Sequence, residues 1–356
     1  MKGPDKIDDV LAKRYQIKGF LGEGGMQFVY LAFDKTLKRD IALKTPKNAT
    51  ASKRFKRSAV VAARVNHPNV AKTLDYFEDK GREYLVEELI DGQDMSQCIF
   101  QHVNYLDPFL VAKIFHRLSR GILASHHAGV VHRDLKPSNI MVAGGFNISE
   151  IKITDFGIAK MAEEEMREAA EGGSDTISAS ATAVGALPYM APEAINTPES
   201  VGLGADIWSL GAMMFELLTG QKPFGNGLKA VNLIVQGKYS AIPNFVLSNP
   251  QFDYLSGQLI SLIKKCLSLN PLERPNAEEL SNECANLCYP ISNRFIGTIN
   301  EIRFNSFGFI TLDYHPDVFF HMTSVYGPRP VIGDKVLLSK FHGGGADRAL
   351  PVLRIN

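Results

Sequence analysis

A glycine-rich segment near the N-terminus, LGEGGMQFVY at residues 21–30, has the composition of a loop that holds phosphate groups. Gly22, Gly24 and Gly25 lie between two apolar runs, and a backbone without side chains can approach an anion closely. A loop of this kind usually carries a third glycine, and this chain has Gln27 in its place. The segment predicts phosphate binding, and Gln27 raises the question of whether the loop still works.

Six further motifs follow this loop in a fixed order. They are IALK with Lys44, VHRDLKPSN at residues 131–139, KITDFG at 152–157, ALPYMAPE at 186–193, DIWSLG at 206–211 and NPLERP at 270–275. Any one of these strings arises by chance, but six in this order over about 250 residues do not. The chain therefore resembles a bacterial Hanks-type Ser/Thr protein kinase from about residue 14 to residue 288.

This resemblance implies a role for each motif residue. Asp134 is expected to orient the substrate hydroxyl and accept its proton, and Lys136 to neutralise charge on the transferring phosphoryl group. Asn139 and Asp155 are expected to bind Mg²⁺ or Mn²⁺, and Lys44 to hold the phosphates of ATP. The predicted ATP-binding residues are Leu21, Gly22, Gly24, Gly25, Val29, Ala42, Lys44, Glu87 and Glu88. The expected substrate is a protein hydroxyl group.

The elements that must position these residues fall into three parts. Residues 15–89 show short apolar runs with one helical segment near 52–65, which predicts a small sheet with a single helix. Residues 96–288 are mainly helical, with 3.6-residue periodicity at 108–128, 203–219 and 252–268. The last sixty residues or so contain five short alternating runs, which predict a small barrel.

The expected fold class is therefore α+β. It comprises a two-lobed protein kinase fold over residues 14–288, with a mainly β N-lobe at about 14–90 and a helical C-lobe at about 91–288. A five-stranded OB-type β-barrel is expected over residues 293–356.

One departure from the family concerns the partner of Lys44. The family carries a glutamate nine residues before the histidine of NHPN, and this chain has Ser58 there. Residues 41–74 contain no acidic residue. Glu87, however, stands at the back of the predicted adenine pocket, where a buried carboxylate needs a cation. We expect Glu87 to pair with Lys44; the alternative is that Glu87 points to solvent through a shift in strand register.

Two more departures affect activity. Gln27 replaces the most dispensable of the three loop glycines, so we expect a working loop with reduced flexibility. Ala186 replaces a threonine whose hydroxyl contacts the catalytic residues, a loss of about 1 kcal/mol for one hydrogen bond. Arg133 can hold a phosphorylated loop, and the candidate phosphosites in the polar segment at 172–185 are Ser174, Thr176, Ser178, Ser180 and Thr182. A plain flexible loop is the alternative for each of these hydroxyls.

Four residues of the motifs are expected to serve folding. Glu193 and Arg274 match a buried ion pair of the family, and Asp206 matches the residue that ties the catalytic loop to a central helix. Trp208 is expected in the core. The four cysteines are too few for a disulfide framework, and Cys284 and Cys288 are expected to be buried thiols.

The C-terminal segment GTINEIRFNSFGFITLDYHPDVFFHMTS resembles the start of a cold-shock domain, a family of single-stranded RNA- or DNA-binding barrels. Strand alternation places Phe307 and Phe309 on one face of their strand, opposite Ile310. Phe319 and His321 likewise share a face, which we expect to point outward. These four residues are a candidate stacking surface for nucleic-acid bases.

Other roles for this barrel stay open. Its phenylalanines could instead pack against the kinase lobe or fill the barrel, and a protein-binding role is the alternative. The local balance of seven basic and five acidic residues over 291–356 predicts only modest attraction to phosphates.

Composition narrows the remaining function classes. The formal charge of the 356-residue chain is +1, so no global field directs it to nucleic acid or membranes. No apolar run is long enough to span a bilayer, and we expect a cytoplasmic protein without membrane association. The oligomeric state is open. The main prediction is an ATP- and Mg²⁺-dependent, autophosphorylating kinase; the alternative is a pseudokinase that serves as a nucleotide-binding scaffold for the barrel.

Overall fold

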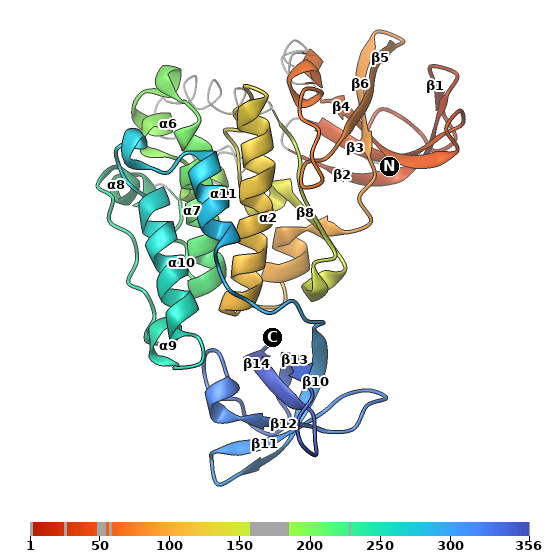
Figure 1. Ribbon diagram of the computed structural model, residues 1–356. Helices are drawn as coiled ribbons and strands as arrows, with labels where there is room; N and C mark the ends of the chain where they lie inside the picture. Colours follow the sequence, from red (N-terminus) through yellow and green to blue (C-terminus); the bar gives the residue numbers. More distant parts are fainter. Residues whose placement is uncertain are drawn as a thin grey trace.

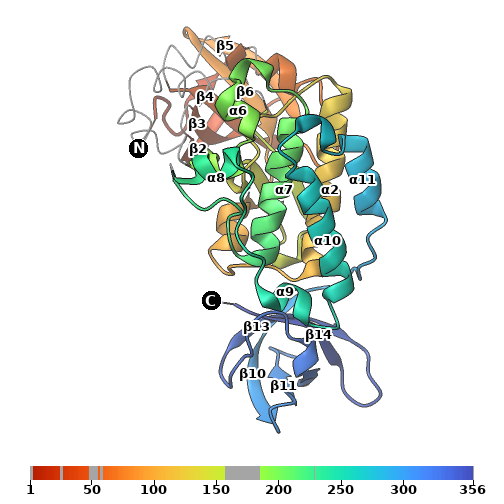
Figure 2. The ribbon, with the colours of Figure 1, turned by 90° about the vertical axis from the view of Figure 1, so that its left-hand side faces the viewer.

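The computed structural model describes residues 3–24, 27–47, 55–56, 59–156, 185–227 and 229–355. Figure 1 shows three parts in a row: an N-terminal sheet, a helical lobe and a C-terminal barrel. The rotated view agrees that the barrel lies at the end of the helical lobe opposite the N-terminal sheet (Figure 2). The described residues thus form the two lobes that the resemblance implied, followed by a barrel.

The N-terminal lobe is an antiparallel sheet with strand order β1-β2-β3-β4-β6-β5. Its strands are β1 (Val10–Leu11), β2 (Tyr15–Glu23), β3 (Gln27–Asp34), β4 (Arg39–Pro46), β5 (Thr73–Asp79) and β6 (Arg82–Glu88). Alternate residues of β3 and β4, such as Tyr30 and Ala32 or Ile41 and Leu43, are buried in one core. This period of two is what a sheet with one covered face requires.

The expected helix of this lobe is seen at residues 55–56 and 59–62, and Ser58 lies outside the described residues. Phe55 and Ala59 pack with Leu85 of β6 in a small cluster. The helix therefore rests on the sheet next to the strand that carries Glu87.

The helical lobe contains α2 (Pro108–His127), α6 (Pro192–Asn196), α7 (Gly204–Thr219), α8 (Lys229–Val235), α9 (Asn244–Ser248), α10 (Asp253–Cys266) and α11 (Ala277–Ala285). A π-helical turn spans Ser96–Phe100, and short 3₁₀ turns span Pro137–Asn139, Gly145–Asn147, Leu187–Tyr189, Pro198–Ser200 and Pro271–Glu273. The three long periodic segments are confirmed as α2, α7 and α10. Asp107 caps α2 by accepting from the backbone N–H groups of Phe109 and Leu110.

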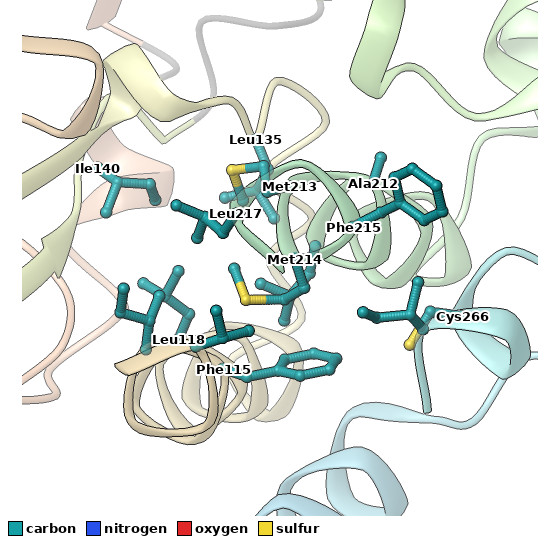
Figure 3. Close-up of a cluster of buried hydrophobic side chains, with 14 of the residues drawn as sticks. Phe115, Leu118, Leu135, Ile140, Ala212, Met213, Met214, Phe215, Leu217 and Cys266 are labelled. Carbon is teal, nitrogen blue, oxygen red and sulfur yellow. The ribbon is translucent and has the colours of Figure 1, made fainter. Parts of the chain in front are cut away.

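The core of this lobe is built around α7, which is buried on almost every side. Figure 3 shows Met214 of α7 beside Phe115 and Leu118 of α2, and Met213 against Leu135. Leu135 follows Asp134 in the sequence, so the packing of Leu135 against α7 anchors the segment that carries Asp134. Trp208 is fully buried in this core, as expected.

A small sheet of order β7-β8-β9 lies where the two lobes meet. Its strands are β7 (Gln93–Asp94), β8 (Ile140–Ala143) and β9 (Glu150–Ile153). The segment before β8 carries Asp134 and Asn139, and the segment after β9 carries Asp155. The β8–β9 hairpin therefore brings two distant motifs side by side.

The C-terminal strands close into a five-stranded barrel of order β10-β11-β12-β14-β13. They are β10 (Phe295–Arg303), β11 (Phe307–Thr311), β12 (Val318–His321), β13 (Lys335–Phe341) and β14 (Arg348–Arg354), with a 3₁₀ turn at Met322–Ser324. Closure comes from the antiparallel pairing of β10 with β13. All five predicted strands are confirmed.

The barrel and the helical lobe share a hydrophobic core. Tyr326, Leu337 and Leu353 belong to the same buried cluster as the interior of α2, α7 and α10. The Tyr326 hydroxyl donates to the Leu218 carbonyl at 3.1 Å. The Arg294 guanidinium is buried and donates to Asp107 Oδ1 at 2.9 Å, so a barrel residue contacts the cap of α2.

Two absences hold for the described ranges alone. None of their helices combines the length and the apolar character needed to cross a membrane. None of their cysteines forms a disulfide; Cys98, Cys266 and Cys284 are buried. Cys288 is exposed, which corrects the expectation of a buried thiol, because it lies beyond the end of α11.

Candidate active site

In the loop between α2 and β8, two of the predicted residues, Lys136 and Asn139, donate hydrogen bonds to the carboxylate of a third, Asp134. Lys136 Nζ donates to Asp134 Oδ2 at 2.7 Å. Asn139 Nδ2 donates to the same oxygen at 3.0 Å and to the Asp134 carbonyl at 2.7 Å. The Asp134 carboxylate is therefore held from two sides, and Asn139 keeps its amide oxygen as an acceptor.

Asp206 of α7 fixes the backbone of this loop, as expected. Its carboxylate accepts from the backbone N–H of His132 at 2.9 Å and of Arg133 at 2.8 Å. His126 Nε2 lies 3.0 Å from the same carboxylate, at the C-terminal end of α2. Arg133 has a φ of 69°, an unfavourable backbone region for a residue with a side chain, so these hydrogen bonds hold a strained conformation.

Asp155 enters the site from the segment after β9, with a φ of 62°. The backbone N–H of Thr154 donates to the Asn139 carbonyl at 2.9 Å, which ties this segment to the catalytic loop. The buried His132 ring contacts the Thr154 carbonyl at 2.7 Å and packs against Phe156. Asp155 is thus placed by the same loop that places Asp134.

Lys44 lies between two carboxylates at the back of the site. Its Nζ is 2.6 Å from Glu87 Oε2 and 2.7 Å from Asp155 Oδ1. Glu87 is only 5% exposed, so the solvent-facing alternative is wrong and the expected pair of Glu87 with Lys44 is confirmed. The pairing follows from register, because Ala42 faces Glu87 across β4 and β6 and Lys44 stands two residues further along the same face.

This arrangement separates the protonation preferences of the two acids. Burial raises the pKa of Glu87, and Lys44 opposes that shift. Burial also acts to raise the pKa of Asp155, but the charge of Lys44 and hydrogen bonds from Lys44 and Gln27 outweigh it and lower that pKa. Burial acts to lower the pKa of Lys44, and the two carboxylates outweigh burial and raise it. Asp155 is therefore kept as the ionised carboxylate.

The predicted ATP-binding residues differ in their exposure and in the direction of their side chains. Gly22 and Gly24 lie at the end of β2 and just after it, and Gly25 lies outside the described residues. Leu21 is 51% exposed, whereas Val29 and Ala42 are half-buried. The Glu88 side chain is directed elsewhere: it accepts from Lys152 Nζ at 2.6 Å and from the Lys72 backbone N–H at 2.7 Å. The Glu88 backbone N–H is also engaged, since it donates to the Lys72 carbonyl at 3.0 Å.

The expected structural ion pair of Glu193 with Arg274 is confirmed. Arg274 binds Glu193 in a bidentate ion pair, with distances of 2.6 and 2.8 Å. Ala186 is buried and precedes the 3₁₀ turn at Leu187–Tyr189. The candidate phosphosites Ser174, Thr176, Ser178, Ser180 and Thr182 lie outside the described residues.

The barrel carries its own candidate surface. Ile310, Val318 and Phe320 are buried inside, while Phe307, Phe309 and Phe319 are half-buried on the outer face and His321 is exposed. The Phe307 and Phe319 ring centroids are 5.6 Å apart, and those of Phe309 and Phe319 are 5.9 Å apart. The predicted outward face is therefore a contiguous aromatic surface, and the alternative that these rings fill the barrel is wrong.

Sequence reasoning missed several residues of these two sites. Phe304 is 90% exposed and its ring lies 6.2 Å from that of Phe307. Arg303 and Arg348 place guanidinium groups over Phe309 and Phe319, at 5.6 and 5.7 Å from the ring centroids. Gln27 donates to Asp155 Oδ1 at 2.7 Å. The signal for Gln27 was present in the motif, since an amide replaced a residue with no side chain.

Comparison with known families identifies a protein kinase domain in this chain. A family model described as a protein kinase domain matches residues 15–284. The chain is similar to the probable serine/threonine-protein kinase PknB of Lactococcus lactis, with 32% identity over 252 residues, and to the serine/threonine-protein kinase PrkC of Bacillus subtilis, with 31% over 278 residues. These alignments cover 69% and 76% of this chain but 38% and 39% of those proteins, so the chain spans about two fifths of their length.

Solved structures show the same fold. The structure of Rad53 1–466 in complex with AMP-PNP matches with a TM-score of 0.58 and 24% identity, covering 76% of this chain and 65% of that one. A mutant PknI kinase domain of Mycobacterium tuberculosis matches with a TM-score of 0.56 and 23% identity, covering 80% of this chain and 100% of that one.

Proposed function

The chain belongs to the protein kinase family, and on that premise we propose that it is a serine/threonine kinase that transfers the γ-phosphoryl group of ATP to protein hydroxyl groups. The observation that carries this proposal is the assembly of Asp134, Lys136 and Asn139 on one loop, within the same site as Asp155 and Lys44. Phosphoryl transfer needs such positioned charges more than covalent participation by the protein.

The residues of the loop divide the work. Asp134 orients the acceptor hydroxyl and takes its proton, and Lys136 and Asn139 hold its carboxylate in place. Lys136 also provides a positive charge beside the transferring group. Lys44 binds the phosphates of ATP, and Glu87 holds Lys44 in place from β6.

The residues present fit a divalent metal ion. The described residues contain no group of three or more His, Cys, Asp or Glu side chains that could hold a metal ion by itself. Mg²⁺ in kinases, however, is held by one or two protein oxygens together with the phosphates of the substrate. Asp155 and the amide oxygen of Asn139 supply that donor set, and the buried Oε1 of Gln27 is an orphaned acceptor in the same site. When bound, Mg²⁺ neutralises charge on the phosphates.

The intact catalytic loop favours an enzyme over a pseudokinase scaffold. Ser58 removes the usual partner of Lys44, but Glu87 supplies another carboxylate. The loss of a threonine hydroxyl at Ala186 is a change of about 1 kcal/mol, which slows a kinase without abolishing transfer.

Labelled ATP tests the proposal directly. The full chain, incubated with Mg²⁺ or Mn²⁺, is expected to phosphorylate itself within residues 174–182, at one or more of its serines and threonines. Asp155→Ala is expected to abolish the incorporation, and mass spectrometry locates the modified residue. A folded wild-type chain that incorporates no label with either metal, and none into a generic protein substrate, would overturn the enzyme assignment.

A second function is favoured by the aromatic surface of the barrel. We propose that Phe307, Phe309, Phe319 and His321 bind single-stranded RNA or DNA, as the resemblance to a cold-shock domain suggests. Aromatic rings and guanidinium groups on one face can stack on bases of any sequence, each base contributing about 1–3 kcal/mol. Arg348 lies over Phe319 and adds positive charge near the bases, whereas Arg303 over Phe309 is paired with Glu301.

Titration of the full chain with fluorescent oligonucleotides tests the second function. Phe307→Ala combined with Phe319→Ala is expected to weaken binding at least tenfold, with a shallow salt dependence because the local net charge is small. Tyr254→Ala is the matched control, since Tyr254 is 77% exposed on α10. Unchanged binding in a folded double variant, or none in the wild type, would assign this surface to a protein partner instead.

A further inference from the structure

Gln27 occupies a place in the site that the family gives to a glycine. It is the first residue of β3, directly after the tip of the glycine-rich loop, and it is only 6% exposed. A Cβ atom on Gly24 would lie 3.8 Å from Gln27 Cγ, so the side chain packs beside the backbone of Gly24. The side chain therefore points into the site.

Both polar atoms of this amide are buried, and they are in different situations. Nε2 donates to Asp155 Oδ1 at 2.7 Å, a charge-assisted hydrogen bond. Oε1 has no hydrogen-bond partner among the described residues. A buried acceptor without a partner is destabilising, so this oxygen is suited to a ligand that brings a donor.

The Asp155 carboxylate is held asymmetrically. Lys44 Nζ also contacts Oδ1, at 2.7 Å, so both of these donors bind the same oxygen. Two donors on one oxygen restrict rotation of the carboxylate group, and among the described residues no donor is seen on Oδ2, which leaves that oxygen available to a cation. A rigid second partner of this kind is what orients ligands in metal sites.

We propose that Gln27 is a positioning residue for the metal ion: its Nε2 fixes Asp155 Oδ1 beside Lys44, and its Oε1 accepts a hydrogen bond from water that a hydrated Mg²⁺ brings into the site. Mg²⁺ fits this arrangement because it retains several of its waters when bound. The inference rests on the proposed function, since it assumes that Asp155 is a metal ligand. On this inference, Gln27 has a chemical role at a position where the family has a glycine, and its effect is more than a loss of loop flexibility.

Gln27→Met tests the inference, because methionine has a similar length and no hydrogen-bonding amide. Mn²⁺ binding to the nucleotide-free full chain is measured by electron paramagnetic resonance. The rate is then measured against Mg²⁺ concentration at saturating ATP, and against ATP at saturating Mg²⁺. We expect Mn²⁺ affinity to fall about tenfold and the Mg²⁺ requirement to rise by a similar factor, with KM for ATP changed less than twofold.

Gln16→Met is the matched control. Gln16 is also a glutamine whose Nε2 donates to a carboxylate, that of Asp8 at 3.1 Å, but it lies on the exposed side of β2. This variant is expected to bind Mn²⁺ as the wild type does. Gln27→Glu gives a second test: it keeps the shape but loses the donor, so its metal-free melting temperature should fall and Mn²⁺ should raise it more than in the wild type.

Distinct results would overturn the inference. Unchanged Mn²⁺ affinity and Mg²⁺ dependence in Gln27→Met would show that Gln27 only fills space. A raised KM for ATP with unchanged Mn²⁺ binding would place Gln27 on the phosphates. A Mn²⁺ response of Gln27→Glu no larger than that of the wild type would also contradict it. A wild-type chain that binds Mn²⁺ but transfers no phosphoryl group would defeat the proposed function and leave this inference standing.

Discussion

Lys44 and Glu87 form a buried ion pair between strands of one sheet, with 2.6 Å between Nζ and Oε2. In the resembled family the partner of this lysine comes from a helix, whereas here it comes from β6, next to the strand that carries Lys44. The register of β4 and β6 alone places both groups. The anchor of Lys44 is therefore independent of any movement of the helix around residues 55–62.

Removal of this anchor is expected to impair catalysis more than folding. Glu87→Met leaves Lys44 with Asp155 as its remaining carboxylate, so the fold persists while kcat/KM for ATP falls at least tenfold, the equivalent of about 1.4 kcal/mol. Glu78→Met, an exposed carboxylate of the same sheet, is the control. Steady-state kinetics and a thermal melt separate the two effects, and an unaltered kcat/KM would rule out a role for the pair.

The same variant allows a rescue experiment. Ser58→Glu in the Glu87→Met background restores a carboxylate at the position that the family uses. A recovery of activity would show that Lys44 needs a carboxylate and that either element can supply it. Failure to recover would show that only β6 can place one correctly.

Asp206→Asn is expected to lower both activity and stability. In the wild type the backbone N–H groups of His132 and Arg133 donate to the two carboxylate oxygens of Asp206. In the variant one of these oxygens is replaced by an NH₂ group, which cannot accept, so at least one of the two hydrogen bonds is lost. The free energy of unfolding should fall by about 1–3 kcal/mol, and kcat should fall because Asp134 follows in the same loop. Asp253→Asn on α10 is the control, expected within about 0.5 kcal/mol of wild type. Urea unfolding and kinetics report the two quantities.

One buried ion pair contributes to the docking of the barrel beside the shared hydrophobic core. Arg294→Met leaves Asp107 buried without its cation, and loss of one partner of such a pair costs about 3–5 kcal/mol. Arg303→Met removes an exposed pair with Glu301, which is worth about 0.2–1 kcal/mol. Equal urea midpoints for the two variants would show that the Arg294 contact contributes little.

Lys113 gives the chain a pH-dependent stability near the same interface. Burial lowers its pKa to about 8, and Arg117 and Arg294 add to the shift. Its Nζ donates to the Asn147 carbonyl at 2.7 Å. Between about pH 8 and the ordinary lysine pKa of 10.5, the unfolded chain holds a proton that the folded chain has released, so this lysine makes stability rise with pH.

The Lys113→Met variant checks this sign. The variant lacks the half-buried charge, so its advantage over wild type should be largest below pH 8 and should shrink as pH approaches 10. Urea unfolding of both proteins at several pH values measures the difference. A difference that is constant across this range would contradict the lowered pKa.

Much of the fold followed from local patterns. The alternation around Phe319 and the periodicity of α2 and α7 are short-range signals, so sequence alone places these elements. Glu87 was also predictable, because a carboxylate in an apolar strand must find a cation. These predictions required only neighbours along the chain or a known strand register.

The remaining contacts join residues that the sequence does not relate. Arg294 and Asp107 are 187 positions apart, and Gln27 and Asp155 are 128 positions apart. In neither pair does the surrounding sequence identify the partner residue. Each contact forms only when separate parts of the chain pack together. Tyr326 likewise reads as an ordinary barrel residue until the helical lobe covers it.

Tyr326, Leu337 and Leu353 belong to the same hydrophobic core as the helical lobe, so the barrel is packed directly on that lobe. The barrel lies at the end of the helical lobe away from the N-terminal sheet (Figure 1), whereas Asp134 belongs to the site that contains Lys44 of that sheet. A molecule bound to the barrel is therefore held at the far end of the lobe from Asp134. Only a target long enough to extend along the whole lobe can reach both places on one copy. A compact target captured by the barrel must instead be phosphorylated by a neighbouring copy, so the rate for such targets would depend on enzyme concentration.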